Sequence, residues 1–281
     1  MRNCLFLISL ALSSAACSSG EEEPATAMAR NAATASATTS AVAAPAATDK
    51  TAGSAAAFDF EDNAQKDGGN RAFAYRWPAA VSEIPALVAR FTADRDEQLA
   101  SQKAEWSKSF DDAPDGCIAC ISRGYEKEWK VVADLPQYLS LSADLYVYTG
   151  GAHGNSDKQS LVFSRQAGRA VAGVEMFKSP VALETALGAA LCDRLDDARA
   201  RKRGAPVERS AQWSTDCPGI DEATVLIGSS SGETFDRIGV YFGPYVAGAY
   251  AEGAYELDFP VTASVLDAVK PEFASAFSVR R

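Results

Sequence analysis

A low-complexity segment near the start of the chain limits what the rest can fold into. Between Pro24 and Ala57 most positions are Ala, Thr or Ser, and apart from Met28 the only aliphatic residue larger than Ala is Val42. Such a segment cannot bury enough apolar surface to offset the loss of chain entropy on folding. We therefore expect residues 17–57 to form a disordered tether and the folded part to begin at Phe58. The rest of the chain, from Phe58 to Arg281, is long enough for one large domain or two lobes.

The N-terminal segment 1–16 has the features of a secretory signal peptide. A positive charge at Arg2 precedes an apolar run over residues 5–12, which is shorter than the ~20 residues that a membrane-spanning helix needs. Ser14-Ala15-Ala16-Cys17 resembles a bacterial lipobox, with Ser14 where leucine is usual, so we expect lipidation at Cys17. The alternative is simple cleavage near Ala16. Lipidated Cys17 followed by Ser18 predicts an exported lipoprotein of the outer membrane that faces the periplasm.

The charge and the histidine count exclude several classes of function. The formal net charge is −10, whereas a nucleic-acid-binding protein needs a basic face, so we expect no nucleic-acid partner. The chain has one histidine, His153, which excludes metal sites and catalytic sites that need two imidazoles. We expect neither a metal nor a cofactor.

Helical and alternating apolar patterns are interleaved along the folded part. Helical spacing predicts helices over 82–110 and 180–203, with caps at Ser82 and Ser179 and a stop at Gly204. Strand-like patterns cover residues 73–77, 125–133, 138–149, 160–165, 223–227, 235–242 and 254–259, and a short helix is expected at 262–269. Because these elements do not form regular βαβ units, we expect an α+β fold with mainly antiparallel sheets, each packed with a helix.

Four cysteines remain in the exported part: Cys117, Cys120, Cys192 and Cys217. An even number in an exported domain indicates two disulfides, with three possible connectivities. We expect sequence neighbours to pair, Cys117 with Cys120 and Cys192 with Cys217. A redox-active Cys117–Cys120 pair should open a helix after a strand, whereas this pair lies between a loop and a strand-like stretch, which favours a structural staple.

The segment Gly228-Ser229-Ser230-Ser231-Gly232 matches the turn that carries the nucleophile of serine hydrolases. That turn must lead into a helix, but a strand-like stretch follows here. The only histidine also precedes Ser230 in the chain, whereas the hydrolase triad places it after the serine. We therefore interpret this segment as a hairpin turn.

The segment around His153 is the most distinctive in the chain. Gly150, Gly151 and Gly154 surround the histidine, which implies positive φ angles or close packing of the backbone. We expect His153 to brace this turn from a buried position, with a ring nitrogen bonded to the backbone, and Ala at this position to cost roughly 1–3 kcal/mol of stability. A catalytic role would instead require an orienting carboxylate and a nucleophile.

Residues 146–154, Tyr-Val-Tyr-Thr-Gly-Gly-Ala-His-Gly, resemble the Y-x-Y-T-G-G-A-H-G signature of an extracytoplasmic bacterial family of unknown function. That family occurs in the lysozyme-sensing anti-sigma factor RsiV and beside the catalytic domain of the peptidoglycan deacetylase PdaC. Residues 238–257, with Pro244-Tyr245 and Tyr250, resemble the family's C-terminal part. The resemblance implies an N-terminal PdaC-like lobe at 58–165 and a C-terminal RsiV-like lobe at 166–281.

The resemblance also implies a function without catalysis. A metal-dependent deacetylase needs several histidines, so we expect a stand-alone, non-catalytic binding module on a lipid anchor in the cell envelope. A basic, lysozyme-like protein or cell-wall glycan (peptidoglycan) would be its partner. The alternative is a cell-wall hydrolase or deacetylase-type enzyme that uses His153 with a carboxylate. The expected binding residues are Gly150, Gly151, His153, Asn155, Tyr245 and Tyr250.

Overall fold

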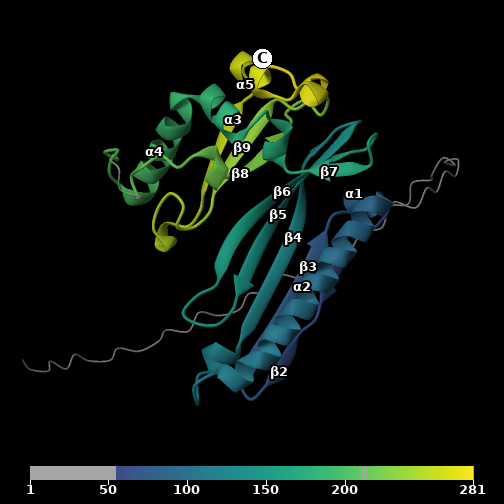
Figure 1. Cartoon of the computed structure of the whole chain (residues 1–281), viewed down its shortest axis with the longest axis vertical. Coiled ribbons are helices and arrows are strands. Elements are labelled where there is room, and N and C mark those ends of the chain that lie inside the picture. The colour runs from purple at the N-terminus through teal and green to yellow at the C-terminus, as the bar shows by residue number, and fades with distance from the viewer. Residues whose placement is uncertain (1–54, 211, 213, 281) are drawn as a thin grey trace, which may run out of the picture. The chain divides into compact units, whose positions relative to one another are not determined.

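The structure, a computed structural model, describes residues 55–210, 212 and 214–280. The predicted signal peptide, Cys17 and nearly all of the predicted tether lie outside the described residues. The described part contains two β-sheets, each packed against helices (Figure 1). This arrangement confirms the predicted α+β class.

The first sheet has seven strands in the order β1-β3-β4-β5-β6-β7, and β2 also pairs with β3. Only β3 and β4 are parallel, and the other neighbours are antiparallel, as predicted. A parallel pair needs a long crossover connection, which the helical segment between β3 and β4 supplies. The strands are β1 (Phe58–Glu61), β2 (Ala64–Lys66), β3 (Gly69–Trp77), β4 (Arg123–Asp134), β5 (Tyr138–Tyr148), β6 (Asn155–Ser164) and β7 (Arg169–Val171).

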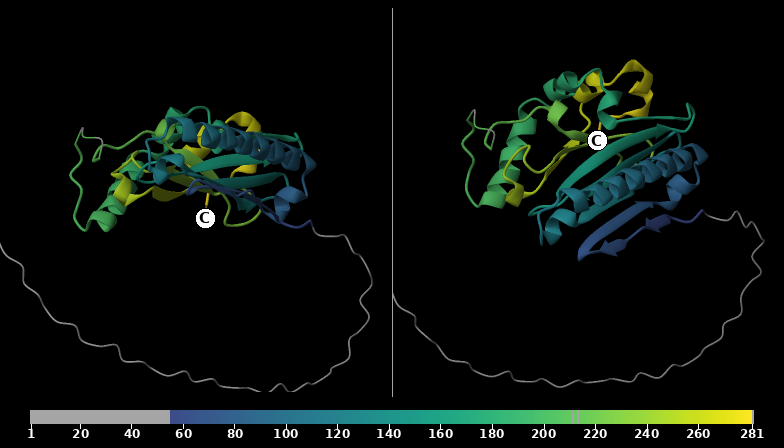
Figure 2. Two further views of the ribbon diagram at one scale, coloured as in Figure 1. Left: turned by 90° about the horizontal axis from the view of Figure 1, so that it is seen from below. Right: turned by 60° about the horizontal axis from the view of Figure 1, so that its bottom comes forward.

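Helix α2 (Pro85–Asp112) lies along one face of this sheet (Figures 1 and 2). Phe91 is 1% exposed and stacks on Trp129 of β4 with ring centroids 4.4 Å apart. The predicted start at Ser82 is wrong, because a short helix α1 (Ala79–Ser82) precedes α2 and Ile84 is the cap residue of α2. The Ser82 hydroxyl instead accepts a hydrogen bond from the Trp77 indole at 3.0 Å.

The second sheet has three antiparallel strands in the order β10-β9-β8, and its core includes residues from three helices. Val162 and Leu135, from β6 and the β4–β5 turn, join this core, so the two sheets share apolar contacts. The first sheet extends through β7 to Val171, and the predicted lobe boundary at residue 165 stays a prediction. The elements are β8 (Thr224–Gly228), β9 (Arg237–Phe242), β10 (Tyr255–Pro260), α3 (Pro180–Leu187), α4 (Ala189–Arg203) and α5 (Ala263–Ala268).

The predicted single helix over 180–203 is wrong, because Gly188 divides it into α3 and α4. Gly188 has φ 57° and ψ −143°, a conformation outside the helical region that only glycine adopts readily. The predicted ends are confirmed. The Ser179 hydroxyl accepts a hydrogen bond from the Ala182 amide, and Gly204 ends α4 in the left-handed conformation.

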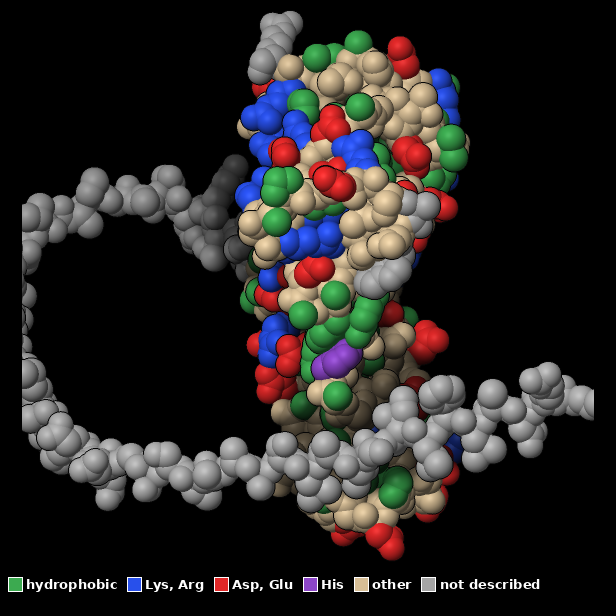
Figure 3. Space-filling model, turned by 90° about the vertical axis from the view of Figure 1, so that its left-hand side faces the viewer, with side chains coloured by type: hydrophobic (Ala, Val, Ile, Leu, Met, Phe, Trp, Pro, Cys, Tyr) green, Lys and Arg blue, Asp and Glu red, His purple; other side chains and the backbone are tan. Residues whose placement is uncertain are grey.

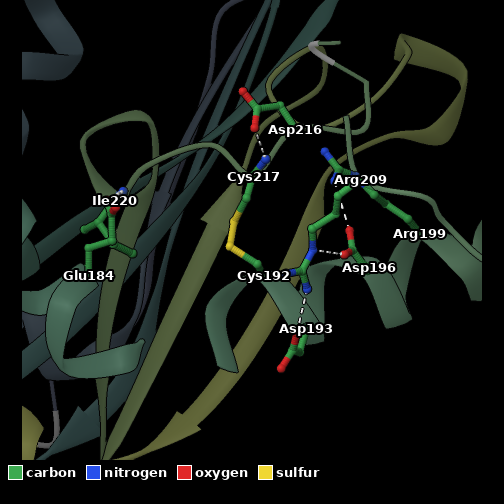
Figure 4. The surroundings of a disulfide bond; sticks show 9 residues. All are labelled: Glu184, Cys192, Asp193, Asp196, Arg199, Arg209, Asp216, Cys217 and Ile220. Atoms are coloured by element: carbon green, nitrogen blue, oxygen red, sulfur yellow. Dashed lines mark hydrogen bonds and ion pairs between the residues drawn. A yellow bond between two sulfur atoms is a disulfide. The ribbon is translucent and has the colours of Figure 1, made fainter. Parts of the chain in front are cut away.

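Both predicted disulfide pairings are confirmed. Cys117 is the cap residue of a short 3-10 helix, η1 (Ile118–Ile121), between α2 and β4, and Cys120 lies within that helix. Cys192 of α4 joins Cys217 in the loop that leads toward β8, and Arg209 from the same loop forms ion pairs with Asp193 and Asp196 of α4 (Figure 4). Within the described residues no helix is long and apolar enough to cross a bilayer.

Candidate functional site

The loop between β5 and β6, residues 149–154, holds the glycines that surround His153, and we call it the glycine loop. Gly150 and Gly151 have φ angles of 103° and 94°, which confirms that two of the three glycines are needed for positive φ. The hydroxyl of Tyr148, at the end of β5, donates a hydrogen bond to the Gly151 carbonyl at 2.7 Å. The first half of this loop therefore turns tightly on the strand that precedes it.

Gly154 is needed for close packing. It is buried, and a Cβ atom at this position would lie 2.4 Å from the Tyr146 ring. The Gly154 carbonyl accepts a hydrogen bond from the Tyr250 hydroxyl at 2.7 Å. The second half of the loop is thus held between a β5 side chain and a tyrosine 96 positions away.

The predicted burial of His153 is wrong, because the imidazole is exposed (Figure 3). Its Nδ1 atom lies 3.0 Å from the Gly154 carbonyl, which is the backbone bond predicted for a bracing role. Its Nε2 atom lies 3.4 Å from the Tyr245 hydroxyl, and its ring stacks on Tyr250 with centroids 3.8 Å apart. The histidine therefore braces the turn and also faces solvent.

The two tyrosines come from the loop between β9 and β10. Tyr245 is 53% exposed and has a φ angle of 71°, in the left-handed region that a tyrosine rarely adopts. Tyr250 is half-buried and begins a short 3-10 helix, η4 (Tyr250–Glu252). The Tyr245 and Tyr250 rings lie 5.4 Å apart. We call His153, Tyr245 and Tyr250 the aromatic cluster.

Glu252 fixes the position of η4 against α4. Its carboxylate pairs with Arg203, 2.9 Å from the guanidinium Nη2, and accepts hydrogen bonds from the Tyr255 hydroxyl and the Ala249 amide. Burial raises the pKa of this carboxyl, but the bonds from Tyr255 and Arg203 outweigh it and hold the pKa below its usual range. Burial and the bond to Glu252 raise the pKa of Tyr255 to about 12. The ion pair between Glu252 and Arg203 therefore fixes the short helix that begins with Tyr250.

The structure thus brings three of the six predicted binding residues together as the aromatic cluster. Gly150 and Gly151 shape the loop that carries His153, and Asn155 is the exposed first residue of β6. The predicted site did not include Tyr146 and Tyr148, which hold the loop from β5. Their places in the Y-x-Y motif, just before the glycines, were the sequence feature that could have indicated this role.

The geometry needed for the two catalytic alternatives does not appear among the described residues. The only hydrogen bonds of His153 there are those to Gly154 and Tyr245, and none of the described carboxylates forms an ion pair with it. Ser230 bonds the carboxylate of Asp236 through its hydroxyl and its amide, in the turn between β8 and β9. The hairpin interpretation of residues 228–232 is therefore confirmed. Residues 55–210, 212 and 214–280 hold no group of three His, Cys, Asp or Glu side chains placed to bind a metal ion.

A cleft of about 800 Å³ lies between α2, β6 and the start of β8, and none of the three residues of the aromatic cluster lines it. Lys127 of β4 is 5% exposed there and pairs with Asp94 of α2 at 2.7 Å. Asp94 also accepts a hydrogen bond from the Tyr75 hydroxyl at 2.6 Å, and burial together with this bond raises the pKa of Tyr75. No sequence pattern predicts this network, because each member taken alone is typical of an ordinary helix or strand position.

Comparison with known proteins supports the resemblance carried by the histidine motif. The model of the family described as Deacetylase PdaC matches residues 64–156, which include β2 to β5 and the whole glycine loop. No curated protein matches the chain significantly.

Among the solved structures that resemble the chain are two members of the DUF3298 family. One is a DUF3298 family member from Bacteroides fragilis, with 16% identity and a TM-score of 0.45, over 78% of this chain and 95% of that one. The other is a DUF3298 family protein from Pseudomonas aeruginosa, with 16% identity and a TM-score of 0.44, over 80% of this chain and 97% of that one. By the family match, residues 64–156 of the chain are similar to the PdaC family.

Proposed function

We propose that this protein is a non-catalytic binding module of the bacterial cell envelope and that the aromatic cluster contacts its ligand. The ligand class that this surface fits best is cell-wall glycan. Tyrosine and histidine rings present an apolar face together with polar edges, which suits a sugar ring with its hydroxyl and acetamido groups. The observation that carries the proposal is Tyr245, which is 53% exposed on a backbone of unfavourable φ.

Strain of this kind usually persists where function requires it. The left-handed conformation of Tyr245 lowers the stability of the fold. Because its ring is about half exposed, packing of the ring offsets little of that loss. Tyr250 and His153, in contrast, are held by bonds to Gly154. The cluster therefore combines two anchored rings with one projecting ring, which is the arrangement of a preorganised contact surface.

A basic, lysozyme-like protein is the second candidate ligand. A cleft of about 310 Å³ is lined by Tyr146, whose ring lies against Gly154, and by five carboxylates, Glu126, Glu128, Asp144, Asp157 and Glu256. Only Arg76 and Lys158 contribute positive charge to the same lining. With a net charge of −10 for the chain, this surface would attract a cationic partner and speed its association.

The proposal includes the envelope location. A lipidated Cys17 and a tether over residues 17–57 would hold the module at the outer membrane, facing the periplasm and the cell wall. The enzyme alternative is weaker, because its essential residue, His153, has backbone and tyrosine partners rather than a carboxylate among the described residues.

Co-sedimentation with purified peptidoglycan sacculi tests the proposal, with lysozyme binding measured in parallel. His153→Ala and Tyr245→Ala should each lower sacculus binding about tenfold or more without unfolding the chain. Val181→Ala is the matched control, because Val181 is 68% exposed on α3. Sacculus binding that survives both cluster variants would overturn the glycan assignment. Loss of lysozyme binding alone would favour the basic-protein candidate.

A further inference from the structure

The Cys117–Cys120 disulfide lies directly beneath the glycine loop. A Cβ atom on Gly150 would lie 3.1 Å from the Ala119 carbonyl and 3.5 Å from the Cys120 Cα atom. The Tyr148 hydroxyl, bonded to Gly151, is also 3.4 Å from the Ala119 carbonyl. The backbone that the disulfide closes is therefore the surface on which Gly150 and Gly151 rest.

Arg123 strengthens this contact from the first residue of β4. Its Nη1 atom donates hydrogen bonds to the Cys120 and Ser122 carbonyls, both at 2.8 Å. The same Nη1 atom would lie 3.3 Å from a Cβ atom on Gly150. A shift of the Cys120 carbonyl would thus move the guanidinium against the glycine loop.

The glycine loop is held at two ends, and His153 lies near one of them. The disulfide segment and Tyr148 hold Gly150 and Gly151, whereas Tyr146 and Tyr250 hold Gly154. The exposed residues Ala152 and His153 lie between these anchors. Loss of the first anchor would widen the range of positions open to the imidazole that stacks on Tyr250.

Opening this bridge should leave the fold intact. A disulfide stabilises a protein mainly by closing a loop in the unfolded chain, and the loop here spans a sequence separation of only 3. The Trp106 indole also keeps the end of η1 on α2 through a 2.8 Å bond to the Ile121 carbonyl. The effect of opening should therefore be local to the residues around Ala119 and Cys120.

We infer that the Cys117–Cys120 disulfide and Tyr148 position the aromatic cluster, so that the redox state of this bridge sets the ligand affinity of the cluster. The role in ligand binding rests on the proposed function. Both cysteines are partly exposed, which allows attack by a dithiol. In that exchange the dithiol becomes a disulfide, the Cys117–Cys120 bond breaks, and each cysteine sulfur gains a proton.

The single histidine of the chain makes the positioning step measurable without a ligand. The NMR signals of the His153 ring should carry a ring-current shift from Tyr250, which lies 3.8 Å away. In a Cys117→Ser/Cys120→Ser variant, and in Tyr148→Phe, these signals should move toward the values of free histidine. The control variant Cys192→Ser/Cys217→Ser should leave them unchanged at temperatures where it stays folded.

Affinity for a soluble chito-oligosaccharide is the second readout. It should fall about tenfold in the Cys117→Ser/Cys120→Ser variant and in the dithiol-treated wild type. Unmoved His153 signals in both Cys117→Ser/Cys120→Ser and Tyr148→Phe would overturn the inference. If the oxidised wild type binds no oligosaccharide while the His153 signals do move, the proposed ligand is wrong and the positioning role stands.

Discussion

At the scale of one residue, the backbone conformation of Tyr245 shows how the proposed ligand surface would conflict with stability. Two described residues other than glycine have positive φ angles, Asp67 and Tyr245. Asp67 precedes Gly68 in the turn between β2 and β3, where aspartate tolerates the left-handed region. No such local reason applies to Tyr245, whose side chain cannot hydrogen-bond its own backbone.

Replacing Tyr245 with glycine should therefore separate stability from binding. Glycine adopts a φ angle of 71° without strain, so Tyr245→Gly should retain the free energy of unfolding or raise it by up to about 1 kcal/mol. The same change should abolish ligand binding. Urea denaturation checks the first outcome. A loss of about 2 kcal/mol or more, typical of a buried side chain, would show that the tyrosine packs as a structural residue.

The structure changes the stability effect expected for His153→Ala. Because the imidazole is exposed, its removal leaves no buried group without a partner, and the loss should be under about 1 kcal/mol, below the range expected for a buried histidine. Thermal denaturation of the variant measures this loss. A drop of several kcal/mol would indicate that the stack on Tyr250 supports the fold of the loop.

The carboxyl group of Asp62 should make the stability of the protein depend on pH in the acidic range. Hydrogen bonds from Lys103 and Arg71 hold its pKa below the usual range. A lowered pKa in the folded state means that this stabilisation is present above the unfolded pKa, about 4, and is lost as the pH falls through the folded value. Asp62→Asn should be less stable than wild type at pH 7, and the difference should shrink below pH 4. A constant difference down to pH 2 would contradict this assignment.

At the scale of elements, the break between α3 and α4 depends on one backbone conformation. Gly188 has no side-chain neighbour that a Cβ atom would meet within 4 Å, so only its dihedral angles require glycine. Gly188→Ala should therefore lower the free energy of unfolding by about 1–3 kcal/mol through backbone strain. Chemical denaturation measures this loss. An unchanged midpoint would mean that α3 and α4 can join into one continuous helix.

The sequence predicts most helices and strands well, because apolar residues recur at helical or alternating spacing over their length. The helix expected at 82–110 is found at Pro85–Asp112, and the strand expected at 138–149 is found at Tyr138–Tyr148. The strands β1, β2 and β7 were missed, since each has only three or four residues and is defined by its partner in the sheet. The helix break was missed because a glycine within a helical pattern carries no sign of its φ angle.

The candidate site could be predicted only in part, for a related reason. The glycines around His153 indicate a special turn from local sequence alone. The contact between His153 and Tyr245 spans 92 positions and depends on how the two sheets pack, which no local pattern encodes. The same packing, rather than residue type, decides that the histidine is exposed.

At the scale of the whole molecule, the proposed architecture is a folded module on a lipid anchor. The proposal rests on the lipobox-like residues before Cys17 and on the composition of the predicted tether. Cys17 and nearly all of that tether lie outside the described residues. Cys17→Ser should move the protein from the membrane fraction to the soluble periplasmic fraction, while the folded module keeps its melting temperature. Fractionation followed by immunoblotting checks this. Unchanged membrane association would exclude lipidation at Cys17 as the means of attachment.

The central claim, that the aromatic cluster is the ligand-binding surface, is tested most directly by titrating a chito-oligosaccharide against the His153 ring signals. Since the chain has one histidine, these signals report on the cluster without assignment of other residues. We predict saturable shifts of both ring protons, absent in Tyr245→Gly and retained in Val181→Ala. Saturable binding seen by calorimetry with no movement of the His153 signals would place the ligand elsewhere on the molecule and contradict the account.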